Sequence, residues 1–342
     1  MKWWHLAALI LPAALLVLVV SGRPDAQPLT GLELGVVSGR EVPRARDAKW
    51  LGAKVVRIEF SLGDSPRRLA PIISAYARAG VRVLPLAGFI GRMPSPSEAA
   101  NLATWAAAFG PGGSFWHNRP GRSFAIQDIE FGNETSYGYQ FAGCGSGCPQ
   151  YAPRARAYAL AFVAAQQAIA GPQGNPNVGL LAQADYGGNG DEWVNGMFEA
   201  VPDLAAHVAG WTVHTYGPPT SWQPSIDALV GQTRARGAPA SIPIYITELG
   251  LASDNGACLR NNYGWNRCMT YAQAGHALSA TITSIRARYG VRIHSIFIYQ
   301  TADHVPPGRD VNREDYFGVL RWNGSPKGAY TKAVRSLLQA SP

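Results

Sequence analysis

The chain has 342 residues, of which 47% are hydrophobic and 15% are charged, and its formal net charge is +8. This composition supports a large buried core and excludes a globally disordered protein. The arginine residues are scattered rather than gathered in a basic stripe with aromatic residues between them, so the charge indicates no nucleic-acid partner.

The N-terminal segment is typical of an export signal. Lys2 supplies a positive charge, residues 6–20 form an apolar run, and Val20-Ser21-Gly22 offers small residues for cleavage. The run is short for a membrane span, and an uncleaved anchor is the alternative. We therefore expect residues 1–22 to be a signal peptide or N-terminal anchor, residues 23–29 a short linker, and residues 30–342 a single secreted or extracytoplasmic domain. Any membrane attachment would run only through an uncleaved N-terminal segment.

From residue 31 onward, apolar runs alternate with helical patterns. One helical pattern is Leu69, Ile72, Ile73 and Tyr76, which follow i, i+3, i+4, i+7, and Gly80 stands where that helix should stop. The expected strands are 32–37, 54–60, 81–86, 125–131, 177–182, 209–214, 243–248 and 293–299. The expected helices are 41–51, 66–79, 96–108, 153–170, 191–206, 224–236, 269–288 and 328–339.

This alternation predicts an α/β protein with a (β/α)8 TIM barrel. The strand runs are nearly all apolar, as parallel strands covered on both faces require. A doubly wound open sheet is the alternative. Its usual glycine-rich phosphate loop is not evident, because the glycines of residues 110–113 precede the fourth strand and so lie at the wrong end of a strand.

Two of the expected strands carry a glutamate at their C-terminal end. Glu134 closes the run Ile-Glu-Phe-Gly-Asn-Glu of residues 129–134, and Glu248 lies in the run Ile-Tyr-Ile-Thr-Glu-Leu-Gly of residues 244–250. Active sites of such barrels lie at the C-terminal ends of the strands, and strands four and seven face each other across the mouth. Two facing carboxylates are the minimum needed to cleave a glycosidic bond.

These motifs, in this order, resemble the glycoside hydrolases of clan A, retaining barrels that include families 5 and 39. The resemblance depends on six segments: Gly52–Ile58 with Arg57 in strand two, Asn133-Glu134 after strand four, His214-Thr215-Tyr216 in strand six, Ile246–Gly250 in strand seven, and the closing segments Phe317–Leu320 and Ser325–Tyr330. The clan often has proline where Thr135 stands and tryptophan near Tyr299. Both departures concern the class of substrate.

The resemblance implies a secreted retaining glycosidase acting by double displacement on O-linked sugars, most naturally β-linked ones, of an oligo- or polysaccharide. Glu134 would be the general acid and later the base, and Glu248 the nucleophile. The first step needs Glu134 protonated and Glu248 ionised. The expected partner is therefore a carbohydrate, with no cofactor and no metal. A non-catalytic carbohydrate-binding or cell-envelope protein on the same barrel is the main alternative, because one barrel hosts many functions.

Four further residues would bind the substrate or orient the glutamates. Asn133 would hydrogen-bond the sugar's 2-hydroxyl, although Asn133-Glu134-Thr135 is also a glycosylation sequon. Tyr216 would orient Glu248, and His214 shares its strand face, so it would line the sugar site or serve as a core histidine. Arg57 stands in an apolar strand, where an unpaired charge is costly. Glu130 or Glu59 would pair with it while it keeps Glu248 ionised, a purely structural ion pair being the alternative.

Aromatic residues and cysteines complete the predicted site. The cysteines form two close pairs in the loops after the two catalytic strands, which favours the local disulfides Cys144–Cys148 and Cys258–Cys268 in an oxidising compartment, with other connectivities open. Their spacing fits no common zinc pattern.

Flat side chains in or near strand-to-helix loops would stack on sugar rings: Tyr137, Tyr139, Tyr186, Trp222, Trp265 and Tyr299.

Overall fold

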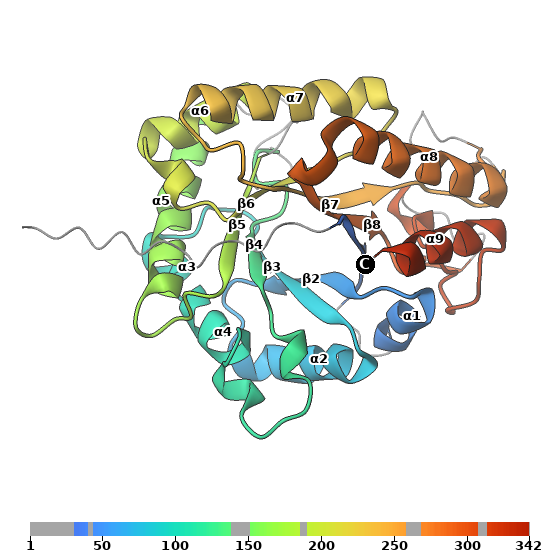
Figure 1. The fold of residues 1–342 in the computed structure, drawn as a ribbon, viewed down its shortest axis with the longest axis horizontal. Helices are drawn as coiled ribbons and strands as arrows, with labels where there is room; N and C mark the ends of the chain where they lie inside the picture. Colours follow the sequence, from blue (N-terminus) through green and yellow to red (C-terminus); the bar gives the residue numbers. More distant parts are fainter. Residues whose placement is uncertain are drawn as a thin grey trace, which may run out of the picture. The chain divides into compact units, whose positions relative to one another are not determined.

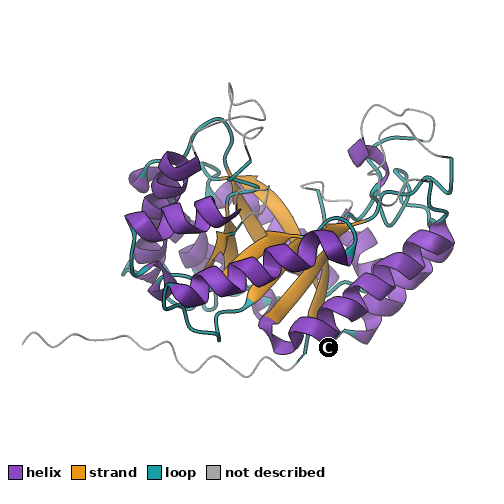
Figure 2. Ribbon diagram, turned by 90° about the horizontal axis from the view of Figure 1, so that it is seen from above, coloured by secondary structure: helices purple, strands orange, loops and turns teal. Residues whose placement is uncertain are grey.

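The computed structural model describes residues 31–39, 44–137, 151–184, 190–257, 268–306 and 313–341. The predicted signal segment (1–22) and linker (23–29) lie outside these residues. Within the described residues, eight parallel strands close into a barrel in the order β1 to β8, and helices surround them (Figures 1 and 2). The predicted (β/α)8 barrel is confirmed. Among the helices described here, none is both long and apolar enough to span a bilayer.

Each predicted strand has a counterpart in the barrel. The strands are β1 (Glu33–Val37), β2 (Val55–Ser61), β3 (Arg82–Gly88), β4 (Asp128–Phe131), β5 (Gly179–Gln183), β6 (Gly210–His214), β7 (Ile244–Gly250) and β8 (Ile293–Tyr299). The pairing of β1 with β8, from Glu33 opposite Ser295 to Val36 opposite Ile298, closes the ring. The closed ring places the C-terminal ends of β4 and β7 on one mouth of the barrel.

The helices lie between consecutive strands and after β8. They are α1 (Arg44–Leu51), α2 (Pro66–Ala79), α3 (Pro96–Ala99), α4 (Leu102–Phe109), α5 (Tyr151–Ala170), α6 (Gly190–Ala200), α7 (Pro219–Ala235), α8 (Tyr271–Tyr289) and α9 (Ala329–Ala340). Short 3-10 turns are η1 (Ser114–Trp116), η2 (Arg122–Phe124), η4 (Leu204–Ala206), η5 (Gly290–Arg292) and η6 (Arg313–Tyr316).

The prediction of one helix over 96–108 was wrong, because the structure has two. A capping box between Ser95 and Glu98 starts α3. At the junction the chain tightens into i→i+3 hydrogen bonds. Asn101 N–H donates to Glu98 O (3.2 Å), and in the first turn of α4 Ala103 N–H donates to Ala100 O (3.1 Å) and Thr104 N–H to Asn101 O (3.0 Å). The hydrophobic spacing predicted the buried face but not this local tightening.

Two other helices begin or end at a different residue from the predicted one, and in both cases a proline is the cause. The helix predicted over 191–206 ends as α6 at Ala200, because Pro202 cannot continue the hydrogen-bond ladder. The helix predicted over 224–236 begins earlier, at Pro219, where a proline in the first turn sacrifices no intrahelical hydrogen bond. As a consequence Trp222 lies inside α7 rather than in a loop.

Strand residues alternate between two packed regions. Residues such as Val36, Val56 and Ile246 are fully buried in the large core cluster. Their neighbours of the opposite parity point into the barrel, where a second cluster packs. That interior cluster consists of Val37, Val55, Leu84, Leu181, Tyr245 and Phe297.

The next interior layer toward the C-terminal mouth is polar and buried. It contains Arg57, Glu130, Gln183, Thr212 and Thr247, each at most 3% exposed. Arg57 and Thr247 both donate to Glu130, and Gln183 accepts from the N–H of Thr135, whereas Thr212 Oγ1 has no hydrogen-bond partner within the described part of the chain. These residues therefore form a platform under the predicted site.

Candidate active site

A tight turn after β4 presents Glu134. Gly132 has φ of +83°, and a Cβ there would lie 2.5 Å from Thr135 Cγ2, so glycine is required. Glu134 has φ of +45°, a sparsely populated conformation for a side-chain-bearing residue and one that clusters at functional sites. The N–H of Thr135 donates to Gln183 Oε1 (3.1 Å), which anchors the turn to the polar layer.

The carboxylate of Glu248, at the end of β7, is buried among hydrogen-bond donors. Arg57 Nη1 donates to Oε1 (2.7 Å) and the Tyr216 hydroxyl donates to Oε2 (2.7 Å). His214 Nδ1 lies 3.5 Å from Oε2. Burial acts to raise the pKa of Glu248, but the charges of His214 and Arg57 and the Tyr216 hydrogen bond together lower it below its ordinary value. Glu248 is therefore ionised at neutral pH.

Arg57 connects the polar layer to the site. Its Nε donates to Glu130 Oε2 (2.5 Å), and its Nη2 donates to Asn133 Oδ1 (2.7 Å). Thr247 Oγ1 donates to the other Glu130 oxygen (2.8 Å). Burial disfavours the charged guanidinium, but Glu130 and Glu248 more than offset it and raise the pKa of Arg57 above its ordinary value. The sequence predicted Glu130 or Glu59 as the partner of Arg57, and the hydrogen bond from Arg57 Nε identifies Glu130.

His214, at the end of β6, meets Glu134 across the mouth. The distance between His214 Nδ1 and Glu134 Oε1 is 2.8 Å. Burial opposes protonation of the ring, yet the charge of Glu248 and the hydrogen bond and charge of Glu134 raise the pKa of His214 to about 9. The ring is thus protonated at neutral pH. Its Nε2 is buried and has no hydrogen-bond partner within the described part of the chain.

One oxygen of Glu134, one oxygen of Glu248 and a ring nitrogen of His214 lie within 4.8 Å of one another. Two carboxylates and an imidazole of this kind could ligate a divalent ion. A metal ligand must be deprotonated, however, whereas the raised pKa of His214 keeps a proton on the ring, and Arg57 already neutralises Glu248. The donor set therefore fits a proton-transfer pair better than a metal centre.

Aromatic rings form one wall of the site. Tyr216 packs edge-on against Tyr299 (6.4 Å between centroids) and against Phe317 (5.8 Å), and Tyr299 packs against Phe317 (5.5 Å). Burial and then the charge of Glu248 raise the pKa of Tyr216 well above its ordinary value, so Tyr216 remains a hydrogen-bond donor. Phe317 had no predicted role, although its segment was noted. Its position depends on a fold-back after β8 that has no local signal.

The other predicted binding and disulfide residues divide into two groups. Trp222 is 2% exposed in α7 and packs against Tyr289 (6.4 Å between centroids), so it is a core residue, and its prediction as a sugar-binding residue is corrected. Tyr137 is half-buried, and its N–H donates to Glu134 O (3.0 Å). Cys268, the one cysteine within the described residues, is not a free thiol. The remaining predicted residues lie outside the described residues: Tyr139, Tyr186, Trp265, Cys144, Cys148 and Cys258.

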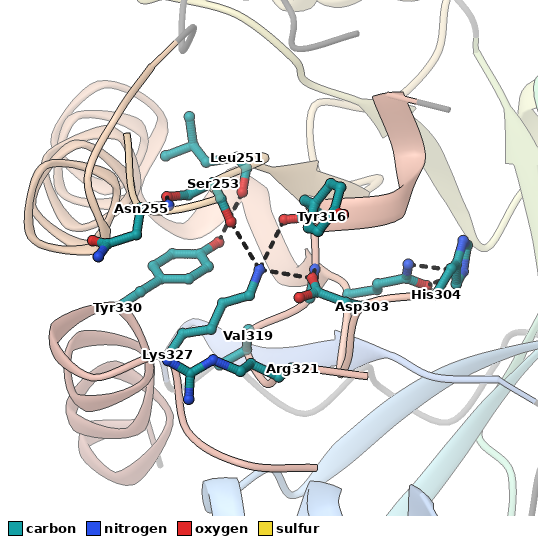
Figure 3. Close-up of polar contacts among 12 residues, drawn as sticks. Leu251, Ser253, Asn255, Asp303, His304, Tyr316, Val319, Arg321, Lys327 and Tyr330 are labelled. Carbon is teal, nitrogen blue, oxygen red and sulfur yellow. Dashed lines mark hydrogen bonds and ion pairs between the residues drawn. The ribbon is translucent and has the colours of Figure 1, made fainter. Parts of the chain in front are cut away.

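A buried ion pair joins Lys327 to Asp303 beside the backbone of Ser253 and Tyr316 (Figure 3). Lys327 Nζ donates to Asp303 Oδ1 (2.7 Å), Ser253 O (3.0 Å) and Tyr316 O (3.0 Å). The N–H of Gly318 donates to the same Asp303 oxygen (2.9 Å). The pair thereby ties the segment after β7 to the fold-back that carries Phe317. The sequence does not predict this pair, because Lys327 and Asp303 are 24 residues apart and only the fold-back brings them together.

Comparison with known proteins supports the architecture. No protein-family model and no curated protein matches the chain. Among solved structures, an endo-laminarinase from Formosa Hel1_33_131 is similar with a TM-score of 0.60 and 14% identity, over 90% of this chain and 87% of that one. A β-D-glucuronidase from Dictyoglomus thermophilum has a TM-score of 0.56 and 12% identity, over 91% of this chain and 51% of that one. A Ruminococcus gnavus β-glucuronidase has a TM-score of 0.54 and 11% identity, over 90% and 50%.

These neighbours are glycoside hydrolases, and the chain shares their barrel, as the resemblance to clan A implied. The chain spans about half the length of the β-glucuronidases and most of the endo-laminarinase. At these identities the likeness is one of fold, so the chemistry has to be argued from the site itself.

Proposed function

We propose that this protein is a glycoside hydrolase that cleaves β-linked sugars with retention of anomeric configuration. The observation that carries the proposal is the close approach of Glu134 and Glu248, of which one oxygen each lies within 4.8 Å of the other. Retaining enzymes hold their two carboxyl groups about 5–5.5 Å apart, whereas inverting enzymes need about 6.5–9.5 Å to admit a water molecule. The short separation favours a covalent intermediate on one of the two carboxylates.

Glu248 is the nucleophile in this proposal. Its ionised state is favoured by Arg57 and His214, and the Tyr216 hydroxyl and Arg57 each hold one of its oxygens. A fixed, charged carboxylate can attack the anomeric carbon with little reorganisation. The orienting groups also restrain Glu248 while the glycosyl-enzyme bond forms and breaks.

Glu134 is the acid in the first step and the base in the second. The 2.8 Å hydrogen bond to His214 Nδ1 gives it a proton partner whose pKa is raised to about 9. We propose that this pair shares the proton that Glu134 delivers to the leaving oxygen. In the second step water attacks the anomeric carbon, the bond from the sugar to Glu248 breaks, and Glu134 takes a proton from the water, so that both glutamates return to their starting states.

Asn133 contributes a contact to the sugar itself. Arg57 Nη2 donates to its Oδ1, so the amide oxygen faces the guanidinium and the amide N–H2 is the group left to donate. A hydrogen bond from this amide to the 2-hydroxyl would strengthen as charge develops on the ring. Tyr216 and Tyr299 would supply the apolar wall.

Export of the protein remains part of the proposal. Residues 1–22 have the composition of a signal segment, and the cysteine pairs suit an oxidising compartment. The β-linked polysaccharide or oligosaccharide substrate would then be met outside the cytoplasm. The endo-laminarinase and β-glucuronidases of similar fold support a carbohydrate substrate.

The proposal is tested with purified protein on a panel of aryl β-glycosides and β-linked polysaccharides. Glu248→Gln should abolish turnover, and Glu134→Gln should lower it by about 10²- to 10⁴-fold. Glu199→Gln is the matched control, because Glu199 is half exposed on α6 and pairs with Arg156. The first-formed product, followed by NMR, should be the β-anomer.

Two results would overturn the proposal in different ways. An α-anomer as first product would mean inversion and would exclude the covalent intermediate. If wild type cleaves nothing on a broad panel, yet binds a glycan as well as both glutamate variants do, the protein is a carbohydrate-binding protein on the same barrel.

A further inference from the structure

The end of the barrel opposite the catalytic mouth is rich in exposed arginine. In a closed barrel of parallel strands, every connection from a helix to the next strand lies at this end. These connections, together with the last turn of each helix before them, form what we call the N-terminal edge. Arginines at the ends of α2 and α8, between α4 and β4, and at or just after the end of α7 are exposed on it: Arg78, Arg119, Arg122, Arg234, Arg236 and Arg286.

These arginines are not neutralised by carboxylates. None of them forms an ion pair with a carboxylate of the described residues, whereas acidic residues of the same edge already have a cation. Glu33 pairs with Arg82 (2.5 Å), and Asp227 pairs with Arg288. The N-terminal edge therefore carries an excess of positive charge, in a chain whose formal net charge is +8.

The helix dipole accounts for only part of this arrangement. A cation in the last turn of a helix is favoured by the partial negative charge there, which suits Arg78, Arg234 and Arg286. Arg119 and Arg122, however, lie in the connection between α4 and β4, outside any α-helix. The positive charge of the edge thus extends beyond what helix stability requires, which indicates a partner of negative charge.

Exposed apolar side chains interrupt the basic edge. Val291, in the turn between α8 and β8, is 74% exposed, and Trp50, near the end of α1, is 44% exposed. Arg286 lies in the last turn before Val291 and Arg292 follows it directly, while Arg234 lines the same small hollow as Arg292. Apolar side chains among basic ones match a lipid surface, whose headgroups are anionic and whose acyl chains are apolar. A soluble polyanion would bind the arginines alone.

The polypeptide enters the barrel at the same edge. Ser341 Oγ accepts from Leu34 N–H (3.0 Å) and donates to Leu32 O (3.0 Å), which fixes the start of β1 beside the end of α9. The predicted linker, residues 23–29, spans at most about 25 Å when fully extended. An anchor formed by the apolar run of residues 6–20 would therefore tether the barrel by the edge that carries the arginines.

We propose that the N-terminal edge docks on an anionic lipid membrane and leaves the catalytic mouth facing away from the lipid. The arginines bind the phosphate headgroups, and Val291 enters the interface between headgroups and acyl chains. The sequence predicted membrane attachment only through the N-terminal segment, and this docking adds a contact made by the barrel itself. It does not depend on the chemistry of the two glutamates.

The test uses protein from residue 23 onward, because the apolar run of residues 6–20 would enter lipid by itself. This form keeps the β1–β8 pairing and the Ser341 contacts that close the barrel, so its melting temperature should equal that of the full chain. Vesicles of phosphatidylcholine with about 30% phosphatidylglycerol are compared with pure phosphatidylcholine. Binding should be at least about tenfold tighter to the anionic vesicles, and about 1 M salt should abolish the difference.

Two double variants with the same change of net charge separate docking from general attraction. Arg234→Gln with Arg286→Gln should weaken binding to the anionic vesicles about 30-fold. The control is Arg46→Gln with Arg67→Gln, because these exposed arginines lie in the first turns of α1 and α2, at the mouth end. The control should weaken binding less than about threefold. Equal losses in the two double variants would refute docking by the N-terminal edge.

A fluorescent label distinguishes lipid from a polysaccharide. An environment-sensitive dye attached through Val291→Cys should shift its emission to the blue on anionic vesicles, whereas the same dye at Arg67→Cys should not shift. The absence of a shift at residue 291 would overturn the proposal. If polygalacturonate binds the protein as tightly as the vesicles do and depends on the same arginines, with no shift at residue 291, the partner is an anionic polysaccharide and not a membrane.

Discussion

Replacing Lys327 with methionine should destabilise the fold by about 3–5 kcal/mol, which is the cost of leaving the other member of a buried ion pair without its partner. The side chain of Lys327 is fully buried, and that of Asp303 is 4% exposed. The substitution deprives the Asp303 carboxylate of its cation and the carbonyls of Ser253 and Tyr316 of a donor (Figure 3). Each unsatisfied buried group costs about 1–3 kcal/mol. Methionine keeps most of the apolar stem, so little of the loss should come from a cavity.

The loss of folding free energy caused by Lys327→Met should be larger at high pH than at low pH. Burial raises the pKa of Asp303 to about 7 even with Lys327 beside it. A carboxyl whose pKa is higher in the folded than in the unfolded state binds more protons when folded, so lowering the pH favours folding. Without the lysine that pKa rises further, and the protonated acid needs no cation. The destabilisation by Lys327→Met should therefore be smaller at pH 5 than at pH 8.

Urea unfolding of wild type, Lys327→Met, Asp303→Asn and the double variant at both pH values measures these effects. The double variant should be less destabilised than the sum of the single variants, with a coupling energy above about 1 kcal/mol. Three outcomes would each show that the pair is not coupled as its geometry indicates. Lys327→Met could lower the free energy of unfolding by less than about 1 kcal/mol, the effects of the two single variants could be additive, or the loss could be equal at pH 5 and pH 8.

Three further predictions follow from the site. Tyr216→Phe removes the 2.7 Å hydrogen bond to Glu248 and should lower kcat about 10- to 100-fold on an aryl glycoside with the melting temperature little changed; an unaltered kcat would contradict the orienting role. The pKa of His214 is raised to about 9, so its contribution to stability, about 3 kcal/mol, should be complete below about pH 6.5 and lost as the pH rises through 9. The free energy of unfolding, measured with denaturant across this range, should fall less steeply with pH in His214→Gln than in wild type. Equal pH dependence in the two proteins would contradict the assignment. Gly132→Ala should cost about 1–3 kcal/mol and lower activity, because φ is +83° and the new Cβ would meet Thr135 at 2.5 Å; thermal unfolding compared with Gly231→Ala, where a Cβ meets nothing within 4 Å, checks this.

The barrel was predictable because its signals are local. Each strand appears in the sequence as a short apolar run, and each helix as a 3.6-residue pattern with a glycine or proline near its end. These signals repeat along the chain, so an error of a few residues at one boundary leaves the topology intact. The misassigned positions lie where local chemistry competes with the pattern, as at Pro219 and at the tight turn between α3 and α4.

The sequence also placed both catalytic candidates at strand ends, since a strand end is a local feature and the closed barrel then puts β4 and β7 on one mouth. It predicted that Arg57 would act on Glu248 and pair with Glu130 or Glu59. It could not choose between those two partners or foresee the contact with Asn133, because these residues come from different strands and the turn after one of them. Such contacts depend on strand register and on the polar layer beneath the site.

Contacts between segments that are distant in the sequence were decided by the tertiary structure alone. Trp222 was predicted in a loop of the active face but is buried in α7, because helix packing rather than sequence position sets which side chains reach the site. Phe317 and the Lys327–Asp303 pair depend on the fold-back after β8. The sequence by itself determined the elements, their order and the two glutamates, since these follow from local periodicity. The three-dimensional packing decided the hydrogen-bond partners and the ionisation of the two glutamates, since these depend on residues that only folding brings together.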